Sequence, residues 1–365
     1  MSESREVKVS LETVLKRSWP LIALGAVLII AVAGGLIWFA VSGSGRKAPV
    51  TQTPGEVTVP TTTGDLVSRS LDGVLVTPAE ANLQPIAVMV ENYTEARPMS
   101  GPAKANLVYE IPVEGGITRY MLVFDATTTA DSIGSVRSAR PYFVDFADGL
   151  NAVYAHVGGS PDALAQIKGL SGFRDLNEFW NGKYFWRTPK RAAPHNIFTR
   201  TDLLAEAIAA KEWRVGHFRG WNYKEEDPET PTSTSLTVRG STDGPDLEFG
   251  GMYNASWSYD HALNIYERSE GGTAQKDQDG TRVTAKNIVV IKTEGKVLDA
   301  EGRLSIRTTG KGKATLYRDG KVFQLTWKRT AGEHLRFEAL DGTDALFNRG
   351  NTWVEVTLDT TTTTP

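Results

Sequence analysis

The sequence predicts an α/β or α+β domain followed by a mainly-β domain, both preceded by one transmembrane helix. Three observations support this expectation. Residues 21–41 carry no charge, strands alternate with helical patterns over residues 65–235, and residues 236–358 hold short strands without a helical period. A chain of 365 residues is also long enough for two folded units.

The N-terminal part is expected to anchor the chain in a membrane. At 1.5 Å per residue, a helix over 21–41 matches a hydrocarbon core of about 30 Å. More basic residues precede this run than follow it, which predicts that residues 1–20 are cytoplasmic and that the folded domains are extracytoplasmic. A cleaved signal peptide is the alternative. Residues 42–64 are rich in Gly, Ser, Pro and Thr and are predicted to be a flexible linker.

In the first domain, residues 86–90 read as a buried strand, and 107–113 with 117–124 read as a hairpin. Helices follow from their end signals. One is expected from Pro141 to Gly149, one after the N-cap Ser160, and one from Thr199 to near Trp213, with Asp202 completing a capping box. Short strands of the second domain are expected at residues 236–238, 263–266, 288–291, 314–317, 322–327 and 353–358. The tail 359–365 is low in complexity and is expected to be disordered.

Composition excludes several classes of function. The formal net charge is only −3, which disfavours nucleic acid as a partner. The chain has no cysteine, so disulfides, thiolate catalysis, thiolate metal ligation and lipidation of an N-terminal cysteine are closed to it. Its five histidines form no close pair, and no metal or other cofactor is expected.

Two arginines stand where a helix is predicted to begin. Arg137 and Arg140 lie just before Pro141, and a helix N-terminus already carries partial positive charge. Guanidinium groups are unfavourable there unless an anion or a carboxylate lies between them, so the pattern indicates an anion site that Arg119 could join. The alternative is that these arginines pair with structural acids such as Asp145 or Glu114.

The segment Gly158-Gly159-Ser160 follows a predicted strand and precedes a helix, an arrangement that offers backbone N–H groups to anions. Ser160 could also be a nucleophile with His156 or His195 as its base. The next residue is Pro161, which has no N–H for an oxyanion hole, so capping is the better interpretation of Ser160.

His195 lies in the segment Ala193-Pro194-His195-Asn196, which is predicted to be a loop. Of the five histidines, it is the leading candidate for acid/base chemistry or ligand binding. Glu114 is the carboxylate candidate for an acid/base pair, although Glu110 is too far along the strand to be its partner. Aromatic and basic residues alternate from Phe179 to Arg191, as in surfaces that stack on sugars, although such residues more often form core and rim. The catalytic candidates are Glu114 and His195, and the ligand-binding candidates are Arg119, Arg137, Ser138, Arg140, His156, Gly158, Gly159, Ser160, Arg187 and Asn196.

Six ordered strings between residues 85 and 196 point to a known family: Pro85–Asn92, Ala96–Gly101, Val113–Arg119, Gly134–Arg140, His156–Pro161 and Ala193–Asn196. Together they resemble the YerB family of bacterial extracytoplasmic lipoproteins, whose N-terminal domain is the domain of unknown function 3048. The β-rich half is similar, more loosely, to the C-terminal domain of that family through Tyr266–Arg268, Asn287–Val290 and Gly350–Trp353.

The resemblance implies a place in the bacterial cell envelope and a role in envelope or peptidoglycan maintenance. Members of that family commonly carry a lipidated cysteine, which this chain lacks, so the helix at 21–41 is expected to replace the lipid as the anchor. The leading hypothesis is a binding or regulatory protein for an anionic or carbohydrate, peptidoglycan-like ligand. A peptidoglycan hydrolase or lyase using Glu114 and His195 is the first alternative, and a scaffold that contacts other envelope proteins is the second.

Overall fold

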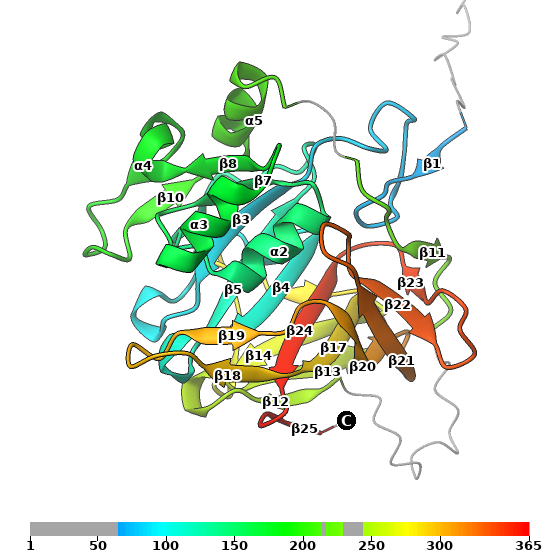
Figure 1. The fold of residues 1–365 in the computed structure, drawn as a ribbon. Helices are drawn as coiled ribbons and strands as arrows, with labels where there is room; N and C mark the ends of the chain where they lie inside the picture. Colours follow the sequence, from blue (N-terminus) through cyan, green and yellow to red (C-terminus); the bar gives the residue numbers. More distant parts are fainter. Residues whose placement is uncertain (1–64, 214–216, 229–243, 365) are drawn as a thin grey trace, which may run out of the picture. The chain divides into compact units, whose positions relative to one another are not determined.

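The computed structural model describes residues 65–213, 217–228 and 244–364. The predicted cytoplasmic segment, anchor and linker, and the strand expected at 236–238, lie outside these residues. Within the described ranges, no helix is both long enough and apolar enough to cross a bilayer. The described chain is mainly β with few helices, as the sequence predicts in outline (Figure 1).

A ten-stranded mixed sheet forms the centre of the molecule. Its strands run in the order β22 (Arg336–Ala339), β21 (Lys321–Arg329), β20 (Gly310–Arg318), β17 (Asn287–Thr293), β24 (Thr352–Leu358), β4 (Leu107–Pro112), β5 (Thr118–Phe124), β3 (Ile86–Glu91), β7 (Val153–His156) and β8 (Arg174–Asn177). The strands β17, β24 and β4 are parallel to one another, and so are β3, β7 and β8.

One sheet joins the two halves of the described chain. Strand β24, near the C-terminus, lies between β17 and β4 and pairs in parallel with both. Its residue Glu355 is in register with Glu110 of β4. The proposed boundary between the two domains, near residue 235, therefore separates segments that share backbone hydrogen bonds in a single sheet.

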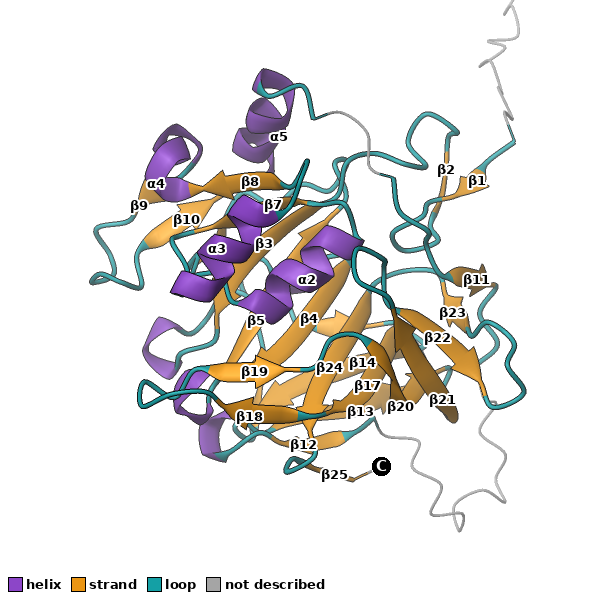
Figure 2. Ribbon diagram, viewed as in Figure 1, coloured by secondary structure: helices purple, strands orange, loops and turns teal. Residues whose placement is uncertain are grey.

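The two faces of the central sheet are covered differently. On one face lie α2 (Pro141–Gly149) and α3 (Pro161–Gly169) (Figure 2). Their apolar residues belong to a core that also includes Met89, Tyr109 and Val354. On the other face, Trp353 packs against Trp257. This second layer includes a six-stranded antiparallel sheet with β15 (Thr273–Ala274), β14 (Ile265–Glu270), β13 (Ala255–Asp260), β12 (Asp246–Glu248), β25 (Thr362–Thr364) and β16 (Thr284–Ala285).

Smaller elements complete the fold. A three-stranded sheet joins β6 (Ile133–Gly134), β10 (Ile197–Thr199) and β9 (Trp186–Arg187). Two-stranded pairs are β1 (Val67–Ser68) with β2 (Leu75–Val76), β11 (Asn222–Lys224) with β23 (Leu346–Asn348), and β18 (Gly295–Val297) with β19 (Leu304–Ile306). The remaining α-helices of the described ranges are α4 (Glu178–Asn181) and α5 (Thr201–Ala210).

Several local predictions are confirmed. The hairpin is β4 and β5, joined by the short 3-10 turn Glu114–Gly116. Helix α2 begins at Pro141 as expected, and Ser160 caps α3 by accepting a hydrogen bond from the Ala163 N–H at 3.3 Å.

Two other predictions are wrong. The hydroxyl of Thr199 belongs to β10 and donates to the Tyr184 carbonyl at 2.8 Å, so it does not cap α5; Arg200 occupies that position without a side-chain cap. Strand pairing of β10 with β6 and β9 outweighs the local capping signal. In the tail, Thr362–Thr364 pairs with β12 instead of being disordered, because the edge of that sheet offers it backbone partners.

A buried ionic cluster ties the central sheet to the second layer. Arg268 of β14 is fully buried and forms ion pairs with Glu110, Glu270 and Glu355, which come from three different strands. The Arg268 guanidinium also lies 4.9 Å from the centre of the Trp353 ring. Burial raises the pKa of Glu355 well above its ordinary value, and the neighbouring charge of Glu110 raises it further.

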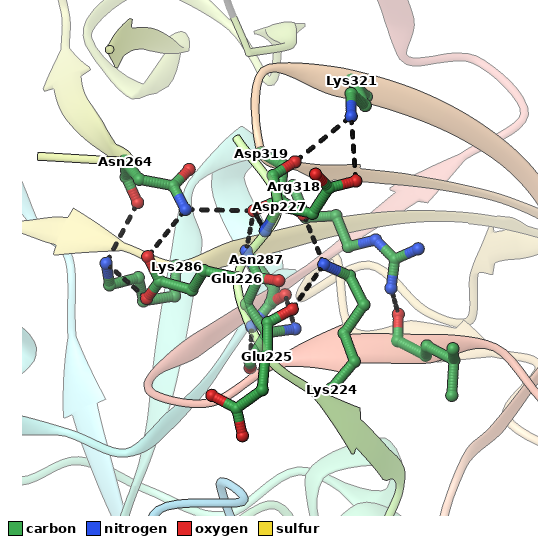
Figure 3. Close-up of polar contacts among 12 residues, drawn as sticks. Lys224, Glu225, Glu226, Asp227, Asn264, Lys286, Asn287, Arg318, Asp319 and Lys321 are labelled. Atoms are coloured by element: carbon green, nitrogen blue, oxygen red, sulfur yellow. Dashed lines mark hydrogen bonds and ion pairs between the residues drawn. The ribbon is translucent and has the colours of Figure 1, made fainter. Parts of the chain in front are cut away.

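A second polar cluster surrounds the turn between β20 and β21 (Figure 3). The carboxylate of Asp319 accepts hydrogen bonds from Lys224 at 2.7 Å, Asn264 at 3.0 Å and Asn348 at 2.6 Å. These bonds and the ion pair with Lys224 outweigh the effect of burial and lower the pKa of Asp319. The cluster holds the segment around Lys224 against the β-rich half.

Candidate functional site

The candidate site lies at one edge of the central sheet. Strands β3, β4 and β7 all point the same way, because β5 is antiparallel to both β3 and β4 while β7 is parallel to β3. Their carboxyl ends therefore lead to the same edge, where Glu91, Glu114 and the Gly158–Ser160 loop follow. The carboxyl edge of parallel strands is where α/β folds commonly bind ligands.

A cavity of about 640 Å³ opens at this edge. Its volume lies within the range of roughly 300–1,000 Å³ that is usual for small-molecule sites. Eight of the residues expected from sequence line it: Glu114, Arg119, Arg137, Ser138, Arg140, Gly159, Ser160 and His195. Residues from four separate stretches of the N-terminal half thus meet in one place.

Arg140 is neutralised by Glu114. Its guanidinium makes a two-pronged contact with that carboxylate through Nε and Nη2, the latter at 2.9 Å. Burial alone would raise the pKa of Glu114, but the hydrogen bonds and charge of Arg140 outweigh it and lower the pKa. Glu114 is therefore ionised at neutral pH, which disfavours the general-acid role expected from sequence. For Arg140, the alternative given in the sequence analysis, pairing with an acid of the protein itself, is therefore the one that the structure shows.

Arg137 and His195 share one carboxylate, that of Glu91. The Nδ1 of His195 lies 2.7 Å from Glu91 Oε2, and the Nε of Arg137 lies 3.5 Å from the same oxygen. The ring of Tyr93 stacks on the imidazole with centroids 5.4 Å apart and planes within 7°. These contacts hold the histidine ring in one orientation, and its Nε2 has no hydrogen-bond partner among the residues that the structure describes.

Arg119 differs from the other arginines of the cavity. It is only 4% exposed, and its one hydrogen bond in the described ranges runs from Nη1 to the Ser138 carbonyl at 2.7 Å. No carboxylate of the described residues forms an ion pair with it. Burial lowers the pKa of Arg119 to about 10, and the like charges of Arg140 and Arg137 add to the effect. The cavity thus contains a buried cation that forms no ion pair with a carboxylate of the described chain, although the charge of Glu114 acts on it from farther away.

The loop Gly158–Ser160 contributes only in part. Gly159 and Ser160 line the cavity, whereas Gly158 does not: its N–H donates a hydrogen bond to Asn177 Oδ1 at 3.1 Å, and it adopts φ +60°. His156, which we expected at the site, is fully buried under this loop. Its Nε2 lies 2.8 Å from Asp175 and its Nδ1 lies 2.6 Å from the Gly158 carbonyl, so it stabilises the loop without lining the cavity.

Arg187 and Asn196 also lie outside the cavity lining. Arg187, on β9, pairs with Glu178 at 2.9 Å and its side chain is 53% exposed. Asn196 follows His195, and its main-chain carbonyl accepts a hydrogen bond from Thr188 at 2.9 Å. Its side-chain oxygen is buried without a hydrogen-bond partner among the described residues. Both residues were predicted to bind the ligand, but neither lines the cavity.

Sequence reasoning missed several residues of the lining. Those from the N-terminal half are Glu91, Asn92, Tyr93, Glu95, Ile117, Thr118 and Pro194. Glu301 and Arg303 come from the turn between β18 and β19, more than 160 residues further along the chain than Arg137. Glu91 stands at the end of a predicted buried strand, where a charge is unusual, and that signal could have found it. No local signal indicates Glu301 or Arg303.

The arrangement offers charge and hydrogen bonding more readily than metal chemistry. Within the described ranges, no group of three or more histidines and acids is placed to hold a metal ion. The polar side chains that line the cavity carry guanidinium groups, carboxylates, the hydroxyls of serine, threonine and tyrosine, one amide and one imidazole. They can bind an anion, and the imidazole can exchange a proton.

Comparison with known proteins places the chain in a family. Residues 71–214 match the model described as "Protein of unknown function (DUF3048) N-terminal domain", and residues 246–354 match its C-terminal domain. The chain belongs to the DUF3048 family. It is 30% identical over 279 residues to YerB of Bacillus subtilis strain 168, a match that spans 76% of this chain and 82% of the relative.

A solved structure of the same family has the same fold. The crystal structure of YerB from Bacillus subtilis matches with a TM-score of 0.71 and 27% identity, and it covers 82% of this chain and all of that one. The resemblance recognised in the motif strings is therefore confirmed. The cavity-lining segments of this DUF3048 protein between Glu91 and Pro194 all fall within the matched N-terminal domain.

Proposed function

We propose that the cavity binds a negatively charged ligand and that the protein is a binding or regulatory component of the bacterial cell envelope. The observation that carries this proposal is Arg119, a buried guanidinium that faces a 640 Å³ cavity without a carboxylate partner among the described residues. A buried charge is costly unless a counter-charge reaches it. A bound anion would supply that counter-charge.

The location follows from the anchor predicted at 21–41 and from the relative. YerB is named as a candidate lipoprotein, a kind of protein that a lipid holds at a membrane surface. This chain has no cysteine to carry such a lipid. We infer that the transmembrane helix replaces it, so that the N-terminus is cytoplasmic and the cavity is extracytoplasmic. In that location, the cavity would have access to fragments of peptidoglycan and to anionic wall polymers.

Isothermal titration tests the binding role. Full-length protein in mild detergent is titrated with purified muropeptides and with wall teichoic acid, and Arg119→Gln is compared with the control Arg187→Gln. Loss of a charge-assisted hydrogen bond costs about 1.5–3 kcal/mol, so Arg119→Gln is expected to weaken binding about tenfold to a hundredfold. The control should bind as the wild type does. Absence of binding to every envelope fragment, or equal binding by Arg119→Gln, would refute the proposal.

One observation favours hydrolysis as a second candidate function. The Glu91–His195 contact of 2.7 Å orients an imidazole whose Nε2 is free among the described residues, an arrangement suited to a general base. Sacculi incubated with wild type, His195→Ala or Glu114→Gln are analysed for soluble products by mass spectrometry. This candidate function requires wild type to release products that His195→Ala does not. If Glu114→Gln alone lost them, the acid/base role would belong to Glu114.

A further inference from the structure

The charges that line the cavity fall into two zones. The floor contains the buried Arg119 and the half-buried Arg137 and Arg140, with the carboxylates of Glu91 and Glu114 as internal partners. Three guanidinium groups face two carboxylates, one of which also contacts His195. The floor therefore keeps one positive charge, which Arg119 carries.

The rim has the opposite sign. Glu95 is exposed and forms no ion pair with any residue that the structure describes. On the turn between β18 and β19, the side chain of Glu301 is 70% exposed. Arg303 lies beside it but is already held by Asp299 at 2.5 Å, with Glu301 farther away at 3.5 Å. The rim is therefore left with a surplus of negative charge from Glu95 and Glu301.

From these two zones we propose that the ligand is zwitterionic: a short peptide whose free carboxylate binds at Arg119 and whose amine faces Glu95 and Glu301. The inference rests on the proposed anion site and specifies its ligand. A single excess charge in the floor matches one carboxylate, whereas a phosphate dianion would leave a negative charge uncompensated near Glu91 and Glu114. An amine near the rim would in turn offset the charge of the two exposed glutamates.

The two contacts should differ in strength. The carboxylate meets a guanidinium that is itself buried, so its loss should abolish detectable binding. The amine meets exposed carboxylates, which salt screens within about 10 Å at 0.1 M. Removing the amine should therefore weaken binding by about threefold to tenfold at low salt, and by less as salt increases.

The test uses three small peptides and one ion on the full-length protein. N-acetyl-Ala-Lys has one carboxylate and one amine. Its Nε-acetyl form keeps only the carboxylate, its C-terminal amide keeps only the amine, and inorganic phosphate serves as a plain anion. We expect the zwitterion to bind most tightly, the Nε-acetyl form about threefold to tenfold less tightly, and the amide not detectably. The double variant Glu95→Gln/Glu301→Gln should bind the first two peptides equally. The control Glu248→Gln, an exposed glutamate of β12, should keep the difference.

The outcomes separate this inference from the proposal beneath it. Equal binding of the zwitterion and its Nε-acetyl form, or tighter binding of phosphate, would overturn the zwitterion and leave the anion site standing. Equal binding of the amide and the free acid would overturn both, as would the absence of binding by all four probes at about 10 mM. If Glu95→Gln/Glu301→Gln still bound the zwitterion more tightly than its Nε-acetyl form, the proposed contact of the amine with these two glutamates would be wrong.

Discussion

Replacement of Arg119 by methionine should stabilise the protein while removing its anion site. Burial lowers the pKa of this guanidinium well below its ordinary value, to about 10, and each unit of pKa corresponds to about 1.4 kcal/mol. The charged form is therefore disfavoured in the folded state by about 3 kcal/mol. Because the folded-state pKa lies below that of the unfolded chain, this cost is present at every pH below about 10 and is relieved only above it.

The expected gain is smaller than that cost. Arg119→Met also removes the hydrogen bond to the Ser138 carbonyl, which is worth about 1 kcal/mol. The free energy of unfolding should therefore rise by about 2 kcal/mol. Methionine is flexible and reaches about as far as the Nε atom of arginine, so it can fill the space of the aliphatic part of that side chain.

Urea unfolding at pH 7, followed by tryptophan fluorescence, measures this change. The matched control is Arg140→Met, which strands the half-buried carboxylate of Glu114 and should lower the free energy of unfolding by about 2 kcal/mol. The two substitutions should therefore change the free energy of unfolding in opposite directions, although both arginines line the same cavity. If Arg119→Met destabilised the protein as much as Arg140→Met does, Arg119 would already be compensated within the fold and would not await a ligand.

Three further changes test other parts of the structure. Glu114→Gln should lower stability at pH 7, and its difference from wild type should shrink as the pH falls through 4, because the lowered pKa of Glu114 contributes stability only above that range; acid titration of both proteins by circular dichroism checks this. Arg268→Met should cost about 3–5 kcal/mol in urea unfolding by removing the counter-charge of buried carboxylates. Because burial raises the pKa of Glu270 and Glu355, this loss should shrink as the pH is lowered, and a loss independent of pH would contradict the ionic explanation. Ser160→Ala should lower the free energy of unfolding by about 1 kcal/mol and raise amide hydrogen exchange in the first turn of α3. Unchanged exchange in that turn would show that the Ser160 hydroxyl does not cap the helix.

Local signals in the sequence predicted the elements that local interactions determine. Pro141 and Ser160 marked the starts of α2 and α3, because proline at the first helical position and serine as a cap act within one turn. The hairpin β4–β5 followed from the two apolar runs around Glu114–Gly116. The capping signal at Thr199 misled because the residue was needed in a strand whose partners lie far away in the sequence.

The site could be predicted only where charge and backbone donors were adjacent along the chain. In the sequence, Arg137 and Arg140 indicated an anion site. In the structure, both line one cavity together with Arg119 and His195. Sequence could not separate the neutralised arginines from the uncompensated one, because Glu114 reaches Arg140 across 26 positions. The contribution of the β18–β19 turn depends on how the second half folds back onto the first, which no short-range pattern encodes.

The position of β24 has a consequence for how the molecule is made. This strand comes later in the chain than every other strand of the central sheet, yet it occupies the middle of that sheet, between β17 and β4. Until it arrives, β4 presents an unpaired backbone edge to its surroundings. The central sheet is therefore complete only once residues 352–358 have been synthesised, and until then the chain exposes an edge that is prone to aggregation. Deletion of β24 would leave the sheet without its centre.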